Sequence, residues 1–173
     1  MAIGQPFGQM RYILPPGHAA DAAITLFLTT RADADAFGCE LVEMDPWARL
    51  GSEPQHMAGF LAVSSPEKRC YSIRYGGERA GVIVVRFPWL SGPYLNLLAI
   101  LARYRGKGLG RAALAWMENG AREAGARNCW LCVSAFNAPA IAFYERCGYS
   151  QAALLDDLIK DGEDELLMRR RIA

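Results

Sequence analysis

The glycine-rich stretch Arg105-Gly-Lys-Gly-Leu-Gly-Arg111 constrains the fold more than any other part of this chain. The apolar run Tyr94–Leu101 before it predicts a buried strand. The residues after it follow a helical pattern as far as Gly125, where a helix can end with a positive φ. A sharp strand-to-helix turn leaves the first helical amides without partners, and these amides and the helix dipole attract anions. Because glycine has no side chain, a phosphate can approach the backbone closely. The stretch therefore predicts a phosphate-binding turn.

Two common phosphate-binding patterns do not fit this turn. A P-loop requires Ser or Thr directly after its lysine, whereas Gly108 follows Lys107. The dinucleotide-binding fingerprint requires a third glycine at the position of Arg111. The pattern that does fit is [Q/R]-x-x-G-x-[G/A], formed by Arg105, Gly108 and Gly110.

This pattern resembles the pyrophosphate-binding signature of the GNAT superfamily, the acyl-CoA-dependent N-acyltransferases. A second segment, Asn137-Ala-Pro-Ala-Ile-Ala-Phe-Tyr-Glu-Arg-Cys-Gly-Tyr149, resembles the N-x-x-A-x-x-F-Y-x-x-x-G-[FY] segment of the same family. The two motifs stand in the order that the family requires. The resemblance covers residues 21–173, which we expect to form one GNAT-like domain, and residues 1–20 form an N-terminal extension.

Composition restricts the class of protein. The chain has 173 residues, 52% of them hydrophobic, and a formal net charge of +1, so we expect one domain with a substantial core and no nucleic-acid partner. The sequence contains neither an apolar run of membrane-spanning length nor a signal-peptide pattern. Its 5 cysteines lack a disulfide framework, which favours a reducing cytoplasm. Cys129 and Cys132 lie on a predicted strand and point to opposite faces, so they are interpreted as small apolar residues.

The order of the predicted elements indicates an α/β fold. The resemblance implies a mixed, mostly antiparallel central sheet of about seven strands, flanked by about four helices. Residues 88–93 are predicted as a loop, and the only possible strand before residue 21 is Met10–Leu14. The other predicted strands are Ala22–Thr30, Cys70–Tyr75, Ala80–Phe87, Tyr94–Leu101, Asn128–Val133, Gln151–Lys160 and Glu163–Arg171. The first two predicted helices run from about Asp33 to Met44 and from Pro54 to about Val63. The third follows the glycine-rich turn and ends at Gly125, and the fourth begins at Ala138.

The resemblance also implies an acetyl-CoA site and no metal. In the family, backbone amides of the turn bind the pyrophosphate, and the strand before the turn splays from its neighbour to pair with the pantetheine arm. An amide near Leu98 or Ile100 would then face the thioester oxygen. Arg105 either adds positive charge or orders the loop. The implied cofactor-binding residues are Leu98, Ala99, Ile100, Arg105, Gly106, Lys107, Gly108, Leu109, Gly110, Arg111, Asn137 and Phe143.

Two residues of the second motif have both a structural and a functional interpretation. Asn137 can cap the helix that begins at Ala138, and the family's asparagine at this position bonds the pantetheine arm. A buried tyrosine usually satisfies its hydroxyl locally. In the family, however, the tyrosine at the position of Tyr144 protonates the departing thiolate. Tyr144 is therefore the predicted general acid.

The general base is not evident. Many family members have a glutamate on the strand before the turn, but Tyr94–Leu101 contains no carboxylate, and Asn96 cannot accept a proton. The amine must then lose its proton to a water chain, to bulk solvent or to a carboxylate elsewhere. The candidate carboxylates are Glu43, Asp45, Asp156 and Asp157, and His18 and His56 have no spacing that suggests a metal or a triad.

The predicted function is transfer of an acetyl group from acetyl-CoA to a primary amine of a small molecule or peptide, by direct attack in a ternary complex. Two loops with aromatic tips, residues 45–49 with Trp47 and residues 87–93 with Trp89, are expected at the acceptor end of the sheet. The alternative is a CoA-binding sensor or assembly module without catalysis. A small kinase is disfavoured because a lysine followed by Ser or Thr and acidic metal-binding pairs are absent. No membrane partner is expected, and a homodimer is left open.

Overall fold

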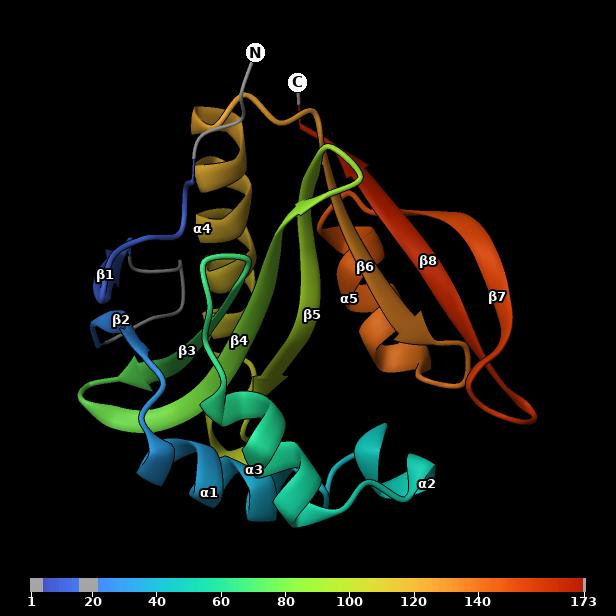
Figure 1. Cartoon of the computed structure of the whole chain (residues 1–173), viewed down its shortest axis with the longest axis horizontal. Helices are drawn as coiled ribbons and strands as arrows, with labels where there is room; N and C mark the ends of the chain where they lie inside the picture. Colours follow the sequence, from blue (N-terminus) through green and yellow to red (C-terminus); the bar gives the residue numbers. More distant parts are fainter. Residues whose placement is uncertain (1–4, 16–21, 173) are drawn as a thin grey trace.

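A computed structural model of the chain describes residues 5–15 and 22–172. The strands are β1 (Arg11–Leu14), β2 (Ile24–Leu28), β3 (Lys68–Tyr75), β4 (Glu78–Trp89), β5 (Gly92–Ile100), β6 (Asn128–Ser134), β7 (Ser150–Lys160) and β8 (Glu163–Arg171). The helices are α1 (Arg31–Leu41), α2 (Trp47–Leu50), α3 (Pro54–Ala62), the 3-10 turn η1 (Ala102–Tyr104), α4 (Leu109–Glu123) and α5 (Ala138–Arg146). The strands form one sheet in the order β1-β2-β3-β4-β5-β6-β8-β7 (Figure 1). The predicted α/β architecture is confirmed.

The sheet is antiparallel except between β5 and β6. These two parallel strands pair only at Tyr94 with Trp130 and at Leu95 with Leu131, and they diverge towards their carboxyl ends (Figure 1). Next to this point β5 contains an irregularity, because Val84 lies opposite Leu97 while Val85 lies opposite Leu95. The edge of β5 that faces β6 therefore has no ladder partner between residues 96 and 100 within the described chain. The splay expected of the strand before the glycine-rich turn is present.

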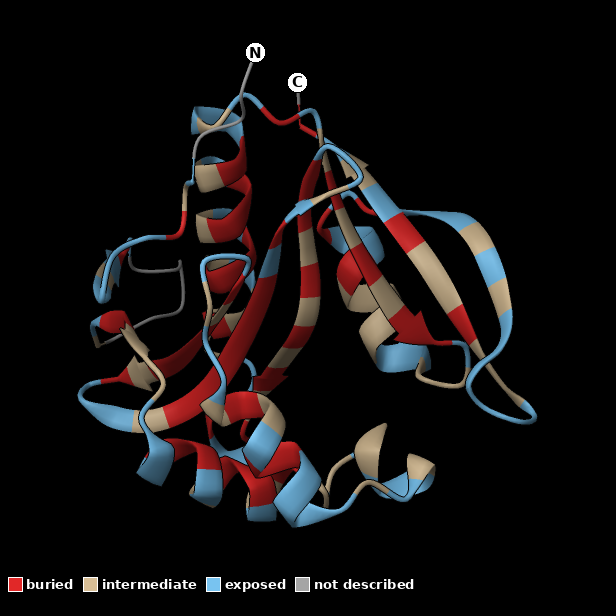
Figure 2. Ribbon diagram, in the orientation of Figure 1, coloured by how far each residue is buried: buried red, intermediate tan, exposed pale blue. Residues whose placement is uncertain are grey.

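The hydrophobic core lies between the central strands and α4. Figure 2 shows buried positions along β3, β4 and β5 and on the side of α4 that faces them. Trp116 of α4 packs against Phe7, Tyr12 and Tyr71, with ring centroids 5.0, 5.1 and 5.3 Å apart. Burial of each large apolar side chain stabilises the fold by about 1.5–3 kcal/mol, so Phe7 and Tyr12 fix residues 7–14 to the domain. Within the described ranges, none of the helices is both long and apolar enough to span a membrane.

Three local features differ from the sequence-based expectations. Strand β1 pairs with β2 and adds an eighth strand to the seven predicted after residue 20. The segment 88–93 is mostly strand rather than loop, with a tight turn at Leu90 and Ser91, whose φ angles are 42° and 61°. Helix α2 forms just after Pro46, in the segment that was expected to be a loop. Helix α1 is capped by Thr30, whose Oγ1 accepts a hydrogen bond from the Asp33 amide at 3.1 Å.

Helices α1 and α3 approach each other most closely at Gly38. A Cβ atom on Gly38 would lie 2.6 Å from the Pro54 carbonyl oxygen and 2.8 Å from the Ala58 Cβ. We expect Gly38→Ala to lower the free energy of unfolding by about 1–3 kcal/mol because α3 must move to make room. Gly59→Ala, in the same helix pair but with open space around the new Cβ, should instead stabilise the protein by about 0.5–1 kcal/mol. Urea unfolding of both variants measures this, and equal midpoints would show that the crossing is not tightly packed.

Candidate active site

The glycine-rich turn presents the uncapped start of α4. Gly108 is the N-cap residue with φ 81°, and it has no side chain to accept from the first turn of the helix. The first hydrogen bond of the helix runs from the Ala112 amide to the Gly108 carbonyl at 3.0 Å. The amides of Leu109, Gly110 and Arg111 donate to no other group in the described chain. Three unpartnered amides at the positive end of the helix dipole suit a phosphate.

The cationic side chains of the turn bind the protein itself. Arg105 donates from Nε to the Ile100 carbonyl at 3.3 Å, which ties the turn to the end of β5. Arg111 donates to the carbonyl of Arg146 at 3.1 Å, which joins the start of α4 to the end of α5. The Lys107 Nζ lies 5.3 Å from the centre of the Tyr75 ring. Of the two interpretations of Arg105, its hydrogen bond favours an ordering of the loop.

Helices α4 and α5 are in close contact at Gly110. A Cβ atom there would lie 3.2 Å from Cζ of Phe143 and 3.8 Å from the Ile100 side chain. A side chain at position 110 would therefore disturb the contact between α4 and α5 as well as the approach of a ligand to the turn. Phe143, predicted as a cofactor contact, has a structural role under the turn.

Helix α5 carries the two polar residues of the second motif. Asn137 caps the helix, with Oδ1 accepting from the Ala140 amide at 3.3 Å, so its structural interpretation is correct. The ring of Tyr144 is buried between Phe143 and Tyr149, with ring centroids 5.2 and 6.0 Å apart. Its hydroxyl forms no hydrogen bond with any described residue. Burial raises the pKa of Tyr144, and Cys147 raises it further, so the phenol keeps its proton at neutral pH and is available to donate it.

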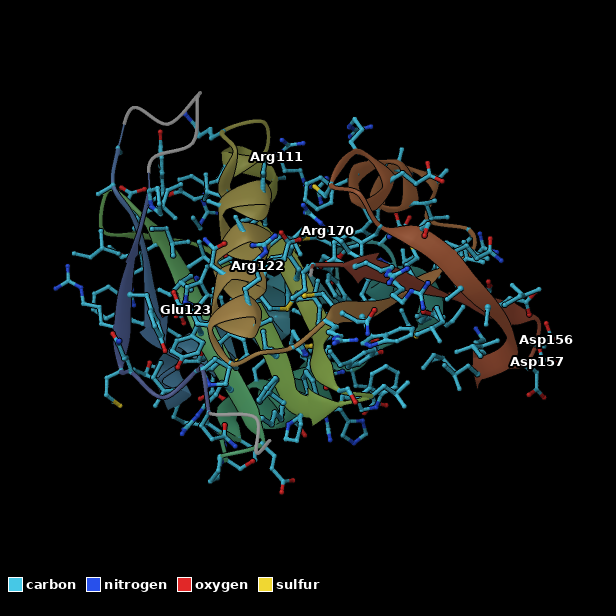
Figure 3. All side chains as sticks on the ribbon, turned by 90° about the horizontal axis from the view of Figure 1, so that it is seen from above. Arg111, Arg122, Glu123, Asp156, Asp157 and Arg170 are labelled. Atoms are coloured by element: carbon cyan, nitrogen blue, oxygen red, sulfur yellow. The ribbon has the colours of Figure 1, made fainter. Side chains whose placement is uncertain are left out.

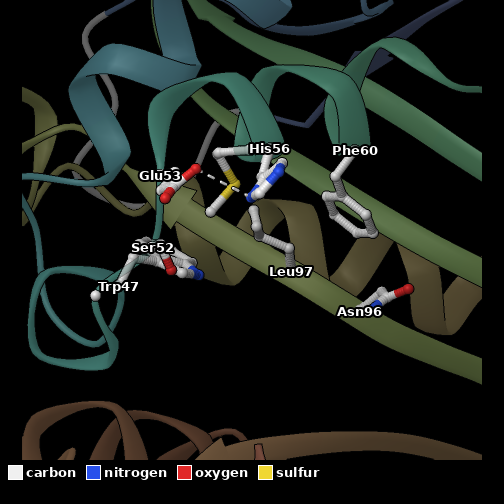
Figure 4. A pocket seen from close by; sticks show the side chains of 9 residues that line it. Trp47, Ser52, Glu53, His56, Phe60, Asn96 and Leu97 are labelled. Atoms are coloured by element: carbon white, nitrogen blue, oxygen red, sulfur yellow. Dashed lines mark ion pairs between the residues drawn. The ribbon is translucent and has the colours of Figure 1, made fainter.

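A pocket of about 450 Å³ lies between α2, α3 and β5. Figure 4 shows Glu53, His56 and Phe60 on one wall and Asn96 and Leu97 of β5 on the other. The complete lining is Trp47, Gly51, Ser52, Glu53, His56, Met57, Phe60, Asn96 and Leu97. The Nδ1 atom of His56 is 3.4 Å from a carboxylate oxygen of Glu53, and both side chains are exposed. Trp47, which was expected at the acceptor end of the sheet, lines this pocket.

Sequence reasoning missed Glu53 and His56. The only local signal was Pro54, which begins α3 and thereby places Glu53 at its N-cap and His56 in its first turn. The histidine and glutamate form a pair only because both are on this turn. Neither residue stands in a recognisable motif.

The carboxylates proposed as bases from the sequence are not brought together. Glu43, Asp45, Asp156 and Asp157 are all exposed, and none of them lines the pocket. Asp156 and Asp157 lie on the outer edge of β7, far from Arg111 at the start of α4 (Figure 3). Asp157 instead accepts a hydrogen bond from the Gly162 amide in the β7–β8 turn.

The prediction that residues 45–49 and residues 87–93 lie at the same end of the sheet is wrong. The β4–β5 turn is at the opposite end of the sheet from α2 and α3 (Figure 1). The Trp89 ring packs against Tyr94 and Trp130, with centroids 4.7 and 5.9 Å apart. Pro88 interrupts the strand pairing, which resumes where Trp89 lies opposite Gly92, so the hairpin continues to this end of the sheet.

Known proteins share this architecture. A streptothricin acetyltransferase of Streptomyces lavendulae is 34% identical over 97 residues, which are 53% of this chain and 51% of that protein. An N-alpha-acetyltransferase of Sulfurisphaera tokodaii is 30% identical over 104 residues, 53% of this chain and 62% of that protein. The chain thus spans about half the length of the curated relatives it matches. The crystal structure of a nourseothricin acetyltransferase superposes with a TM-score of 0.58 at 32% identity, over 62% of this chain and 67% of that one.

The sequence also matches a family model over most of its length. Residues 34–149 match the family described as acetyltransferase (GNAT). This range includes the splayed strand, the uncapped start of α4 and Tyr144. The chain therefore belongs to the GNAT family of acetyltransferases.

Proposed function

We propose that this protein transfers an acetyl group from acetyl-CoA to a primary amine. The observation that carries the proposal is the gap between β5 and β6, which ends at the three unpartnered amides of α4. Extended chains bind well to an unpaired strand edge, so Leu98, Ala99 and Ile100 would pair with the pantetheine arm. The amides of the turn from residue 106 to 111 would bind the pyrophosphate. Asn137 already caps α5, so its amide NH₂ group remains to face the arm.

The chemistry follows from Tyr144 and the edge of β5. The amine nitrogen attacks the thioester carbon, and a backbone amide near Leu98 or Ile100 stabilises the negative charge on the carbonyl oxygen. The C–N bond forms and the C–S bond breaks in one ternary complex. The Tyr144 hydroxyl gives its proton to the departing thiolate. Because this hydroxyl has no partner among the described residues, no existing bond has to break before it donates.

The acceptor would be the primary amine of a small cationic molecule or of a peptide N-terminus. The pocket beside β5 combines the aromatic rings of Trp47 and Phe60 with the Glu53 carboxylate, and such a combination attracts ammonium groups. The two acceptor types correspond to the names of the streptothricin and N-alpha-acetyltransferase relatives. A domain of residues 21–173 would contain the whole site.

Thiol release tests the function directly. The purified chain is mixed with acetyl-CoA and a panel of amines: streptothricin-type antibiotics, peptides with free N-termini, lysine peptides and polyamines. We expect release of free CoA with at least one group of the panel and a rise in Tm on addition of acetyl-CoA. A rise in Tm without release for any amine would favour the alternative, a CoA-binding module without catalysis.

The pocket assignment predicts an effect on the acceptor alone. Trp47→Ala should raise KM for a cationic acceptor about tenfold, because a ring-to-cation contact of about 1–2 kcal/mol is lost. The KM for acetyl-CoA should stay the same. Trp89→Ala removes an equal ring at the opposite end of the sheet and serves as the control, with KM for both substrates unchanged. Steady-state kinetics with each substrate varied in turn measures this, and an unaffected amine KM in Trp47→Ala would place the acceptor elsewhere.

A further inference from the structure

Glu165 of β8 is a buried carboxylate without a cationic partner. Its residue is 6% exposed, and its side chain accepts one hydrogen bond, from the Ser134 hydroxyl at 2.5 Å. No salt bridge of the described chain includes it. The other deeply buried glutamate, Glu118, is bound by Arg170 through two hydrogen bonds of 2.9 and 2.8 Å. Burial of an unpaired carboxylate is costly, and such groups concentrate at functional sites.

The side chain lies on the face of the sheet away from α4. Glu165 is opposite Ser134 in the β6–β8 ladder, and Ser134 shares a face with Trp130 and Cys132 because side chains alternate along a strand. Tyr94 of β5 pairs with Trp130 and belongs to the same face. Burial raises the pKa of Tyr94, and the nearby Cys132 and Glu165 raise it further.

Helix α2 contacts this face through Arg49. Glu163 is two residues before Glu165 on β8 and therefore points the same way. Arg49 of α2 binds Glu163 with hydrogen bonds of 2.9 and 3.1 Å and lies over the Phe136 ring. The same helix contributes Trp47 to the pocket beside β5. Glu165 is therefore on the side of the sheet from which the acceptor would enter.

The strand register places Ser134 beside the proposed reaction centre. Tyr94 is level with Trp130 where β5 and β6 pair. The ladder ends at Leu95 and Leu131, and Ser134 lies three residues further along β6. Ser134 therefore borders the gap that would hold the thioester, and the Glu165 carboxylate is bound to Ser134.

We propose that Glu165 is the general base that takes the proton from the acceptor's ammonium group, with Ser134 holding its carboxylate in place. This role rests on the proposed acetyl transfer. The proton moves from the ammonium nitrogen to a carboxylate oxygen, and the neutral amine then attacks the thioester carbon. Tyr144 protonates the thiolate separately. A carboxylate on β8 thereby fills the role that a glutamate on the strand before the turn would have in other family members.

Polar and charged groups from three elements share this face of the sheet with Glu165. Tyr94 faces it from β5, Cys132 and Ser134 from β6, and Arg49 reaches the same face from α2 through Glu163, whereas the residue opposite it on β7 is the apolar Leu155. Burial raises the pKa of Glu165, and the Ser134 hydrogen bond lowers it. The base is then protonated and inactive at acidic pH and becomes active as the pH rises through its raised pKa.

The pH dependence of kcat/KM tests the proposal. In the wild type, kcat/KM should rise as the pH increases through the pKa of Glu165. A second rise should follow as the pH increases through the pKa of the amine. Glu165→Gln should lower kcat/KM at least tenfold and lose the first rise, with Kd for acetyl-CoA unchanged. Asp164→Asn makes the same change of charge one residue away on the opposite face and should keep the wild-type profile. Ser134→Ala should move the first rise to higher pH, and Ser134→Thr should restore it.

A second readout is independent of activity. A carboxyl group whose pKa is raised by folding stabilises the protein when protonated and loses that contribution as the pH rises through the folded pKa. Glu165→Gln stays neutral, so its Tm should rise relative to the wild type as the pH increases through the raised pKa of Glu165, if it folds as the wild type does. Equal pH profiles of kcat/KM in Glu165→Gln and Asp164→Asn would overturn the role of Glu165 alone. A wild type that binds acetyl-CoA but releases no thiol with any amine would overturn the proposed acetyl transfer, and the base with it.

Discussion

Tyr144→Phe is expected to lower kcat about 10- to 1000-fold while Kd for acetyl-CoA stays nearly the same. The phenol can help only when the thiolate departs, so its contribution belongs to the transition state and not to ground-state binding. Phenylalanine keeps the ring contacts with Phe143 and Tyr149. The Tyr144 hydroxyl has no hydrogen-bond partner among the described residues, so the free energy of unfolding should change by less than the contribution of one hydrogen bond, about 1 kcal/mol. Single-turnover kinetics and calorimetry on the same preparation separate the two effects.

The matched control is Tyr149→Phe. Tyr149 is also buried, its ring centroid is 6.0 Å from that of Tyr144, and the motif accepts phenylalanine at its position. If loss of a nearby buried hydroxyl slowed turnover by loosening α5, both variants would be slow. We expect only Tyr144→Phe to be slow. Unaltered turnover in Tyr144→Phe would mean that water protonates the thiolate and that Tyr144 only packs.

The phosphate-binding turn could be predicted because all its determinants are local. Gly106 and Gly108 have φ angles of 76° and 81°, values that glycine adopts without strain, and the amides that they expose belong to the next few residues. The cap of α5 by Asn137 is equally local. Local rules are sufficient where the sequence neighbours of a residue are also its contacts in space.

The acceptor side of the site depends on contacts between distant residues. Arg49 and Glu163 are separated by 114 positions, and Ser134 and Glu165 by 31. In the sequence, Glu165 is one of three consecutive acidic residues, Glu163-Asp-Glu165. Nothing in the sequence around them shows which of the three is buried. Only the pairing of β8 with β6 assigns it to the buried face. A search for the base along β5 could therefore not find it.

The error at residues 88–93 came from treating proline as the end of a strand. Pro88 lies where the β4–β5 register shifts between Arg86 and Trp89, so its missing amide hydrogen falls outside the ladder. The reversal is made instead by Leu90 and Ser91 with positive φ, which are uncommon residues for that conformation. Helix α2 is a single turn, too short to produce a helical periodicity in the sequence.

Gly108→Val is expected to weaken acetyl-CoA binding at least 100-fold. The N-cap position of α4 has φ 81°, a conformation that costs a residue with a Cβ about 1–2 kcal/mol. A β-branched side chain there either occupies the approach path of the phosphate or turns the amides of Leu109 and Gly110 away from it. Arg105→Ala should weaken binding much less, because its hydrogen bond to the Ile100 carbonyl orders the loop without supplying an amide. Titration calorimetry with acetyl-CoA and with CoA measures both variants.

Gly125→Val separates backbone strain from loss of the ligand site. Gly125 follows the other end of the same helix, with φ 78° and open space around a new Cβ. The Gly125→Val variant should therefore lose about as much stability as Gly108→Val and keep the wild-type affinity for acetyl-CoA. Gly110 cannot provide this comparison, because its Cβ would meet Phe143 at 3.2 Å and disturb the packing of α5 as well. If Gly108→Val bound acetyl-CoA as tightly as Gly125→Val, the unpartnered amides of α4 would not be the pyrophosphate site. Loss of binding in Gly108→Val alone would show that the ligand requires the bare backbone at the start of α4.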